Sequence, residues 1–112
     1  YKMKIKLDEF DSNIVKQNET YTLLDNTELN NSVVSKTILH PHKNTRGHSH
    51  NGQEEIYHFI SGEGYMILGD EQINVEAGSI ILIPDGIFHQ VWNTSSLEDL
   101  VFVCVFDGKR NH

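Results

Sequence analysis

The sequence predicts an all-β fold, either a barrel or a sandwich. Short runs rich in β-branched and aromatic residues follow one another from Val33 to Phe106, and glycine-containing turns separate them at regular spacing. No segment has a convincing amphipathic helical pattern. The 112 residues suffice for one domain with its own core, and they leave no room for a separate cofactor domain.

The predicted strands begin weakly at the N-terminus. Residues 1–31 are polar, and we expect one short strand there, at 21–24, followed by a turn at Asp25-Asn26. The run from 33 to 39 is rich in β-branched residues and predicts a longer strand. Pro41 follows shortly after and favours a loop.

The next strand is expected to carry His48 and His50. These residues are two apart, so on a β-strand their side chains would point to the same face. After the turn signal Asn51-Gly52, residues 55–60 alternate in the way a half-buried strand does. The side chains predicted to share one face of that strand are Glu55, Tyr57 and Phe59.

Further strands are expected at 65–68, 73–75 and 100–106. The run 80–83 is apolar throughout, which predicts a strand buried on both sides. A tight turn at 84–86 then leads to His89, whose side chain would share a face with Val91 and Asn93.

Three imidazoles and one carboxylate form a candidate metal site, namely His48, His50, His89 and Glu55. Imidazole and carboxylate together suit a divalent transition metal such as Fe, Mn, Ni or Zn. In an all-β fold these side chains would converge from different strands and leave coordination positions open for a substrate or water. A bound ion could then polarise a carbonyl or lower the pKa of a bound water.

The spacing of these residues resembles the two sequence motifs of the cupins. The first motif, G(X)5HXH(X)3,4E(X)6G, is matched by His48, His50, Glu55 and Gly62, with His42 in place of its leading glycine. The second, G(X)5PXG(X)2H(X)3N, is matched at every fixed position by Gly78, Pro84, Gly86, His89 and Asn93. The motif glycines, Pro84 and Asn93 are interpreted as structural.

The resemblance implies a single cupin domain over 1–112, a β-barrel of the double-stranded β-helix or jelly-roll type. The two motifs would occupy 46–93, and 1–31 would supply N-terminal strands or an arm. The resemblance also implies that the four candidate side chains hold a metal ion and that the chain forms a homodimer.

Two further residues are candidates for catalytic or substrate-binding roles. Tyr57 shares the predicted face of Glu55, so its phenol could donate to a substrate or exchange a proton. The alternative is a core aromatic residue whose hydroxyl finds a partner. Arg46 lies two residues before His48 and could pair with a carboxylate or phosphate, the alternative being a solvated arginine at the entrance of a strand.

The formal net charge of −7 argues against nucleic acid and against an anionic membrane surface as partners. An anionic substrate remains compatible, because a bound dication and an arginine can dominate a pocket locally. The single cysteine, Cys104, permits no intrachain disulfide, and we interpret it as a small buried hydrophobe. No signal peptide or run long enough for a transmembrane helix is visible, so we expect a cytoplasmic protein.

The cupin motifs say more about the fold than about the reaction. The resemblance suggests a metalloenzyme of the isomerase, epimerase or lyase type that acts on a small polar metabolite such as a sugar or sugar acid. Tyr57 or a bound water would then move the proton. Two alternatives stay open, an Fe-dependent dioxygenase with the same ligands and a binding module without catalysis.

Overall fold

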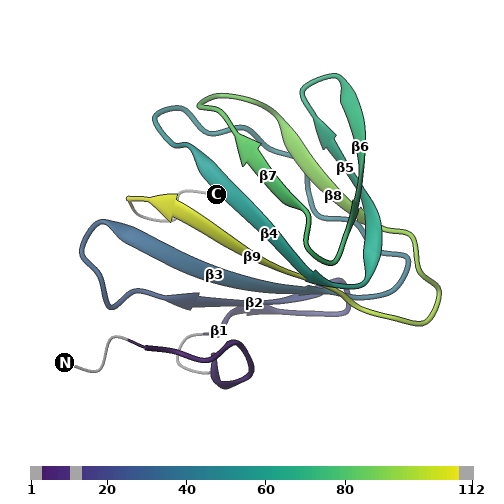
Figure 1. The fold of residues 1–112 in the computed structure, drawn as a ribbon, viewed down its shortest axis with the longest axis horizontal. Coiled ribbons are helices and arrows are strands. Elements are labelled where there is room, and N and C mark those ends of the chain that lie inside the picture. The colour runs from purple at the N-terminus through teal and green to yellow at the C-terminus, as the bar shows by residue number, and fades with distance from the viewer. Residues whose placement is uncertain (1–3, 11–13, 109–112) are drawn as a thin grey trace.

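The computed structural model describes residues 4–10 and 14–108, and these fold into two antiparallel β-sheets packed against each other (Figure 1). A single turn of 3-10 helix, Leu7–Glu9, precedes the first strand, and no α-helix occurs in the described residues. None of their helices is therefore long and apolar enough to cross a membrane. The predicted all-β, jelly-roll-like fold is confirmed.

Within the described residues the larger sheet has six strands and the smaller sheet has three. The larger sheet runs in the order β1 (Ile14–Gln17), β2 (Tyr21–Asn26), β3 (Ser32–Leu39), β9 (Leu100–Asp107), β4 (Glu55–Ser61) and β7 (Ile80–Ile83). The smaller sheet runs in the order β6 (Glu71–Glu76), β5 (Glu63–Leu68) and β8 (His89–Asn93). The predicted strands at 33–39, 55–60, 65–68, 73–75 and 100–106 all lie within these elements.

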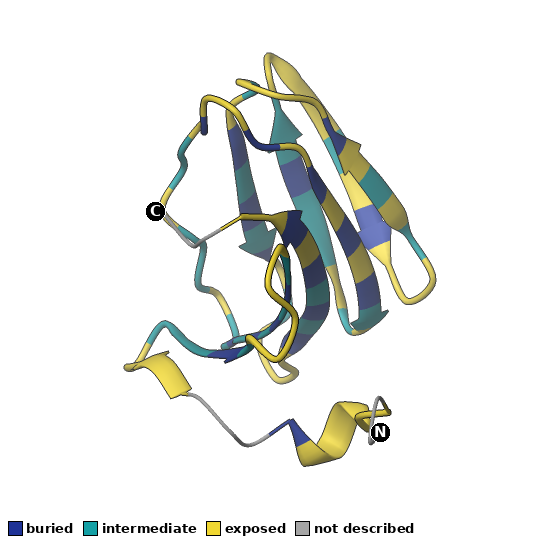
Figure 2. Ribbon diagram, turned by 90° about the vertical axis from the view of Figure 1, so that its left-hand side faces the viewer, coloured by how far each residue is buried: buried dark blue, intermediate teal, exposed yellow. Residues whose placement is uncertain are grey.

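The core lies between the two sheets, and β3 to β9 each contribute buried side chains to it. Along β4 and β9, buried residues alternate with more exposed ones (Figure 2), because successive side chains of a strand point to opposite faces. Phe59 of β4 and Leu39 of β3 are fully buried. The other buried apolar members are Val33, Tyr57, Met66, Val75, Ile83, Val91, Leu100, Phe102, Cys104 and Phe106.

The N-terminal residues form more strand than the sequence predicted. β2 continues through Asp25 and Asn26, which were expected in a turn, because both residues pair with β3. β1 was not predicted, and its four residues are all exposed, so its sequence carries no alternation of buried and exposed positions. Residues 1–3 and 11–13 of the predicted N-terminal arm lie outside the described residues.

The loop between β3 and β4 corrects a second prediction, since His48 and His50 do not lie on a strand. The loop follows the edge of β8, where the amides of Thr45 and His48 donate to the carbonyls of Val91 and His89. Between these two hydrogen bonds the loop advances by three residues and β8 by two. This mismatch interrupts the regular pairing of the loop with β8. His48 therefore forms only an isolated β-bridge, with His89. The course of the loop, and not the alternation of a strand, brings the imidazoles of His48 and His50 together.

β7 corrects a third prediction, because the strand at 80–83 is not buried on both sides. It pairs only with β4 among the described residues and forms one edge of the larger sheet. Its outward side chains, Ile80 and Leu82, are 58% and 67% exposed, whereas Ile83 faces the core and is 3% exposed. An apolar run alone does not reveal whether the outer face of a sheet is covered.

His42 occupies the position at which the first cupin motif has glycine. Its φ of 61° makes it the one described non-glycine residue in the left-handed region, and its amide donates to the carbonyl of Ser95. A side chain disfavours this conformation, which accounts for the glycine of the motif, and histidine is among the residue types that tolerate it best. The departure from the motif thus leaves the backbone path intact.

Candidate metal centre

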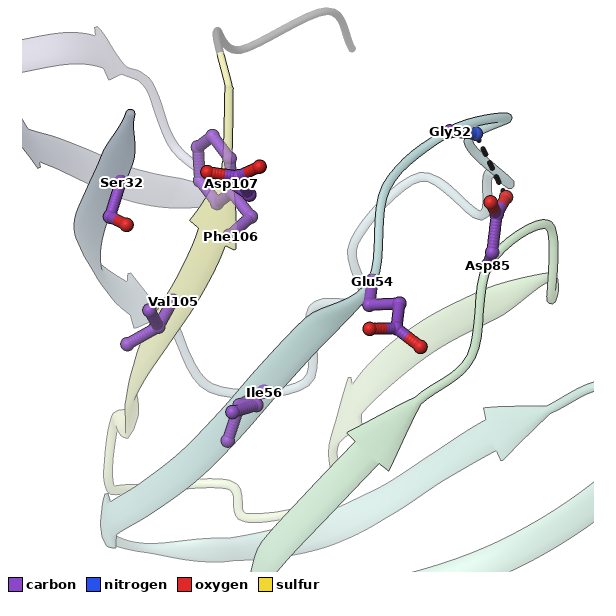
Figure 3. A pocket seen from close by; sticks show the side chains of 8 residues that line it. All are labelled: Ser32, Gly52, Glu54, Ile56, Asp85, Val105, Phe106 and Asp107. Carbon is purple, nitrogen blue, oxygen red and sulfur yellow. Dashed lines mark hydrogen bonds between the residues drawn. The ribbon is translucent and has the colours of Figure 1, made fainter. Parts of the chain in front are cut away.

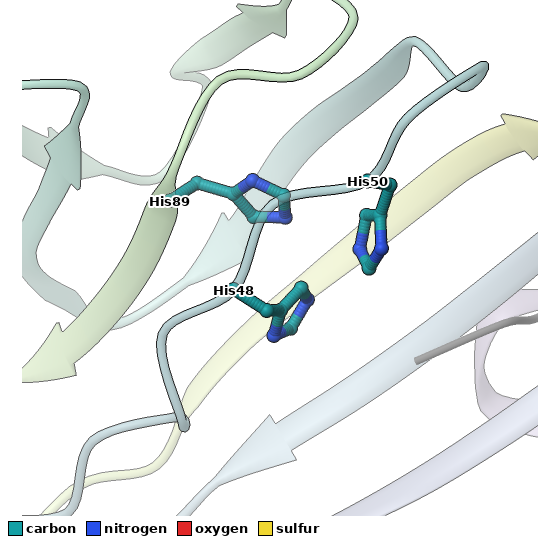
Figure 4. A group of neighbouring side chains, drawn as sticks. All are labelled: His48, His50 and His89. Atoms are coloured by element: carbon teal, nitrogen blue, oxygen red, sulfur yellow. The ribbon is translucent and has the colours of Figure 1, made fainter.

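Three histidine side chains converge between the β3–β4 loop and the start of β8 (Figure 4). One ring nitrogen from each of His48, His50 and His89 lies within 4.8 Å of the others. Imidazole nitrogens bind transition metals at about 2.1 Å, so two ligands of one ion are at most about 4.2 Å apart. A shift of a few tenths of an ångström in each ring is enough, and these three residues can hold a metal ion.

Two of the three imidazoles are oriented by the same backbone contact. Nδ1 of His48 lies 2.9 Å from the carbonyl oxygen of Arg46, and Nδ1 of His89 lies 3.0 Å from that of Ile87. A carbonyl oxygen only accepts, so each Nδ1 donates a proton, and the lone pair of the neutral ring is on Nε2. This arrangement fixes the tautomer and turns Nε2 toward the shared centre, as metal-binding histidines require.

His48 remains neutral well below physiological pH. Burial lowers the pKa of its imidazole from the usual 6.5 to about 4, and the neighbouring rings of His89 and His50 add to this effect. The carbonyl of Arg46 and the carboxylate of Glu55 oppose the shift and are outweighed. A neutral imidazole is the form that binds a metal ion.

The metal-free protein is expected to lose stability as the pH falls from about 6.5 to about 4. In this window His48 is protonated in the unfolded chain and neutral in the folded chain. The unfolded state therefore binds more protons, and the free energy of unfolding decreases as the pH falls. Chemical denaturation over a pH series, with His48→Asn beside the wild type, measures this contribution. An equally steep decline in the variant would assign the loss to other groups.

Glu55 brings a buried carboxylate to the same place. It begins β4 and is 2% exposed, with Oε1 3.2 Å from Nε2 of His50 and 3.9 Å from Nε2 of His89. Oε1 and the Nε2 of His89 are both buried, and neither makes a hydrogen bond to another described residue. A buried carboxylate oxygen that lies beside the imidazoles of His50 and His89 suits a cation bound among the three histidines, so the donor set fits a divalent transition metal.

The structure assigns Cys104 a contact that the sequence interpretation missed. The residue is buried, as predicted, but its thiol donates to Oε2 of Glu55 at 3.1 Å. The antiparallel register of β4 and β9 places them together, since it pairs Tyr57 with Cys104 and Glu55 with Phe106. The thiol holds one carboxylate oxygen and leaves the other directed at the histidines.

Replacing Cys104 by valine is expected to weaken metal binding about tenfold, because the carboxylate of Glu55 loses the donor that orients it. Cys104→Ser keeps a donor at the same position and should stay close to the wild type. Competition with a chelator of known affinity measures the difference. Equal affinities in the valine and serine variants would show that the contact has no orienting role.

Tyr57 and Arg46 both line a cavity of about 160 Å³ beside His48. The ring of Tyr57 stacks on Phe102 with centroids 5.1 Å apart and meets the ring of His89 edge-on at 5.8 Å. Tyr57 is therefore a core aromatic that also lines the cavity, and its role toward a substrate stays a prediction. Arg46 is exposed and stands at the same cavity.

Asn93 binds the backbone, as the sequence interpretation predicted. Its Nδ2 donates to the carbonyls of Leu39 and Glu98, both at 2.9 Å, and its Oδ1 accepts from the amide of Ser95. These contacts tie the end of β8 to β3 and to the loop before β9. The asparagine of the second motif therefore supports the site from outside it.

Among curated proteins, the chain is similar to the uncharacterized protein MJ1618 of Methanocaldococcus jannaschii. The two are 32% identical over 74 residues, which is 66% of this chain and 53% of that protein. SCO3923 of Streptomyces coelicolor is 35% identical over 54 residues, or 48% of this chain and 50% of that protein. The chain thus spans about half the length of these relatives.

Among solved structures, one from Klebsiella pneumoniae, described as a conserved protein with a double-stranded β-helix domain, superposes with a TM-score of 0.81. It is 25% identical, with 96% of this chain and 90% of that chain covered. A predicted oxalate decarboxylase of Thermotoga maritima has a TM-score of 0.71 at 24% identity, with 78% and 79% covered. The polyketide cyclase RemF of Streptomyces resistomycificus superposes with a TM-score of 0.73 at 22% identity, and the superposition covers 84% of this chain and 69% of that chain.

The sequence pattern of one protein family matches this chain over residues 35–106, which contain both motifs and all three converging histidines. The match extends from β3 to β9 and leaves out β1 and β2. The chain belongs to the Cupin_2 family of cupin domains.

Proposed function

We propose that this cupin is a metal-dependent enzyme of the isomerase, epimerase or lyase type that acts on a small polar metabolite such as a sugar or sugar acid. His48, His50, Glu55 and His89 would hold the ion. The observation that carries the proposal is the convergence of three imidazoles and the buried carboxylate of Glu55 beside a cavity that Tyr57 also lines. A coordination site and a candidate acid or base thus meet at one small cavity.

In this proposal the metal site and Tyr57 have separate chemical roles. A bound divalent ion supplies a Lewis acid at the end of the cavity where His48 lies. Tyr57 holds or moves a proton through its phenol, and the stacked ring of Phe102 keeps the tyrosine in one orientation. The apolar rings around the site limit the access of water, which strengthens electrostatic contacts to a bound substrate.

The structural neighbours are described with different activities. One is described as a predicted oxalate decarboxylase and another as a polyketide cyclase, and each shares the fold at less than 25% identity. Two alternatives therefore accompany the proposal, an Fe-dependent dioxygenase and a binding protein without catalysis. The buried Cys104 is compatible with a reducing compartment, and we propose a cytoplasmic location.

Elemental analysis of the purified protein tests the metal site, with Glu55→Ala as the variant and Glu54→Ala as the matched control. Glu54 is the preceding residue and is exposed on the outside of the molecule. We expect about one equivalent of Fe, Mn, Ni or Zn in the wild type and the Glu54 variant, and less in the Glu55 variant. Equal metal content in all three would remove Glu55 from the site, and an empty wild type after loading would end the proposal.

Turnover then separates the alternatives. Loss of activity toward sugars and sugar acids in Glu55→Ala supports the enzyme, and oxygen uptake with Fe(II) would favour the dioxygenase. Tight binding of a sugar with no product over long incubation would favour the binding protein.

We also propose that the chain forms a homodimer. The outer face of the larger sheet carries an exposed apolar row across three paired strands, made of Leu82, Ile56 and Val105. A second copy that covers this row would remove apolar area from water. We expect the mass in solution to be that of a dimer and to shift toward the monomer in Leu82→Lys. A wild type of monomer mass would contradict this expectation.

A further inference from the structure

We propose that the cavity beside the histidines takes a small organic anion, whose carboxylate or phosphate is bound by Lys16 and Arg46. The inference rests on the proposed function, because it concerns the same site and adds the charge class of its ligand. It goes beyond the metal-binding residues to a strand that lies outside the family match, since β1 precedes residue 35.

The charge of the cavity differs from that of the whole chain. The sequence has 16 acidic and 9 basic residues. The described residues that line the cavity nevertheless include both Lys16 and Arg46 and no acidic side chain. Two cations at one cavity of an acidic protein attract an anion locally, and the rest of the surface repels it.

A second cavity shows the reverse pattern (Figure 3). It measures about 460 Å³ and is lined by Glu54, Asp85 and Asp107, with no lysine or arginine among the described residues there. Acidic side chains are therefore common enough to line a cavity in this fold. Their absence from the described lining of the histidine cavity is a local property of that cavity, and the nearby carboxylate of Glu55 is directed at the histidines.

A β-bulge places Lys16 at the cavity. The register of β1 against β2 shifts between Ile14 and Lys16. Neighbouring residues of a regular strand point to opposite faces, yet Val15 and Lys16 both line the cavity. Nζ of Lys16 lies 6.0 Å from the centroid of the Tyr21 ring, which also lines the cavity, so a cation–π contact holds the ammonium near its wall.

Arg46 comes to the cavity through the irregular part of the β3–β4 loop. Its carbonyl accepts from Nδ1 of His48, so one residue both orients an imidazole and presents a guanidinium to the cavity. Arg46 therefore lies beside His48, and Lys16 lines the same cavity. A ligand with an acidic group and a hydroxyl or carbonyl a few bonds away could reach both.

The size and lining of the cavity limit the rest of the ligand. A volume of about 160 Å³ is below the range of drug-sized sites and suits a molecule of a few carbon atoms. Leu23 and Phe102 supply apolar wall, and Thr37 and Tyr57 supply hydroxyl groups that can contact a polyol. Small hydroxy acids and polyol phosphates share these properties.

Three ligands with one three-carbon body test the inference, namely glycerol, glycerate and glycerol 3-phosphate. Calorimetric titration of the metal-loaded protein should show at least tenfold tighter binding of an anion than of glycerol, and the better anion identifies the acidic group. Lys16→Gln and Arg46→Gln should each weaken that anion about three- to tenfold with unchanged metal content. Lys43→Gln removes the same charge from a residue outside the cavity lining and should have no effect.

The outcomes separate this inference from the proposed function. Normal metal content with no preference for either anion over glycerol, or with the preference intact in both variants, overturns the inference and leaves the metal site standing. If the wild type holds no metal, the proposed function fails, and the same titrations are made on the metal-free protein. If the metal-free protein prefers an anion over glycerol and this preference falls in Lys16→Gln and Arg46→Gln, the inference is supported. Equal binding of the anions and glycerol overturns it.

Discussion

Replacing His89 by alanine is expected to lower the affinity for a divalent transition metal by more than about 100-fold. Loss of a residue that merely supports a ligand costs about 10- to 100-fold, and loss of a ligand should exceed this. His89 is 2% exposed, lies at the start of β8, and directs Nε2 toward Glu55 through the contact between its Nδ1 and the carbonyl of Ile87. Alanine offers no donor atom in its place, and the neighbouring backbone cannot supply one.

His58→Ala is the matched control for this variant. His58 lies on the exposed face of β4, opposite to Glu55, so its loss lowers the histidine count by one without touching the site. Chelator competition measures both affinities, and thermal unfolding shows whether each variant is folded. A folded His89 variant with wild-type affinity would mean that the ion binds elsewhere.

Gly62→Ala is expected to destabilise the fold by about 2–5 kcal/mol. Gly62 has φ of +87°, a conformation that costs a residue with a side chain about 1–2 kcal/mol. An added Cβ would also clash with the carbonyl oxygen of Asp99 and lie 3.0 Å from Cα of Leu100. Backbone atoms cannot rotate away as a side chain can, so β4 or the loop before β9 must shift at a further cost of about 1–3 kcal/mol.

Gly52→Ala separates the two contributions. Its φ of +86° matches that of Gly62, but nothing lies within 4 Å of a Cβ added there. We therefore expect only the conformational cost of about 1–2 kcal/mol in this variant. Denaturant unfolding of both variants gives the two losses, and their difference is the cost of the clash with the backbone. Equal losses would show that the close approach at Gly62 is relieved easily.

The convergence of the three histidines and much of the fold could be predicted because they depend on local order in the chain. Glu55, Tyr57 and Phe59 alternate with exposed residues, and a period of two reports directly on the faces of a strand. His89 opens β8 after a turn in which Pro84 fixes its own φ and Gly86 adopts a φ of 80°, which glycine tolerates. Motif spacing then linked these segments to one another.

The features that could not be predicted depend on pairing between distant segments. Cys104 contacts Glu55 only because β9 lies beside β4 in a particular register, and one sequence does not fix that register. The exposure of Ile80 and Leu82 depends on what covers the outer face of β7. The bulge that directs Lys16 to the cavity is an irregularity of pairing in a strand without a burial pattern.

The distribution of the candidate metal-binding side chains over the fold has a thermodynamic consequence. Glu55 belongs to the six-stranded sheet and His89 to the three-stranded sheet, while His48 and His50 lie in the β3–β4 loop, which runs along the edge of β8. An ion bound by all four cross-links the sandwich, and the unfolded chain offers no such preformed set. Binding and folding are then linked equilibria, and free metal at about 100 times its dissociation constant adds about 2.7 kcal/mol to the free energy of unfolding. The melting temperature of this protein becomes a measure of the free metal concentration around it.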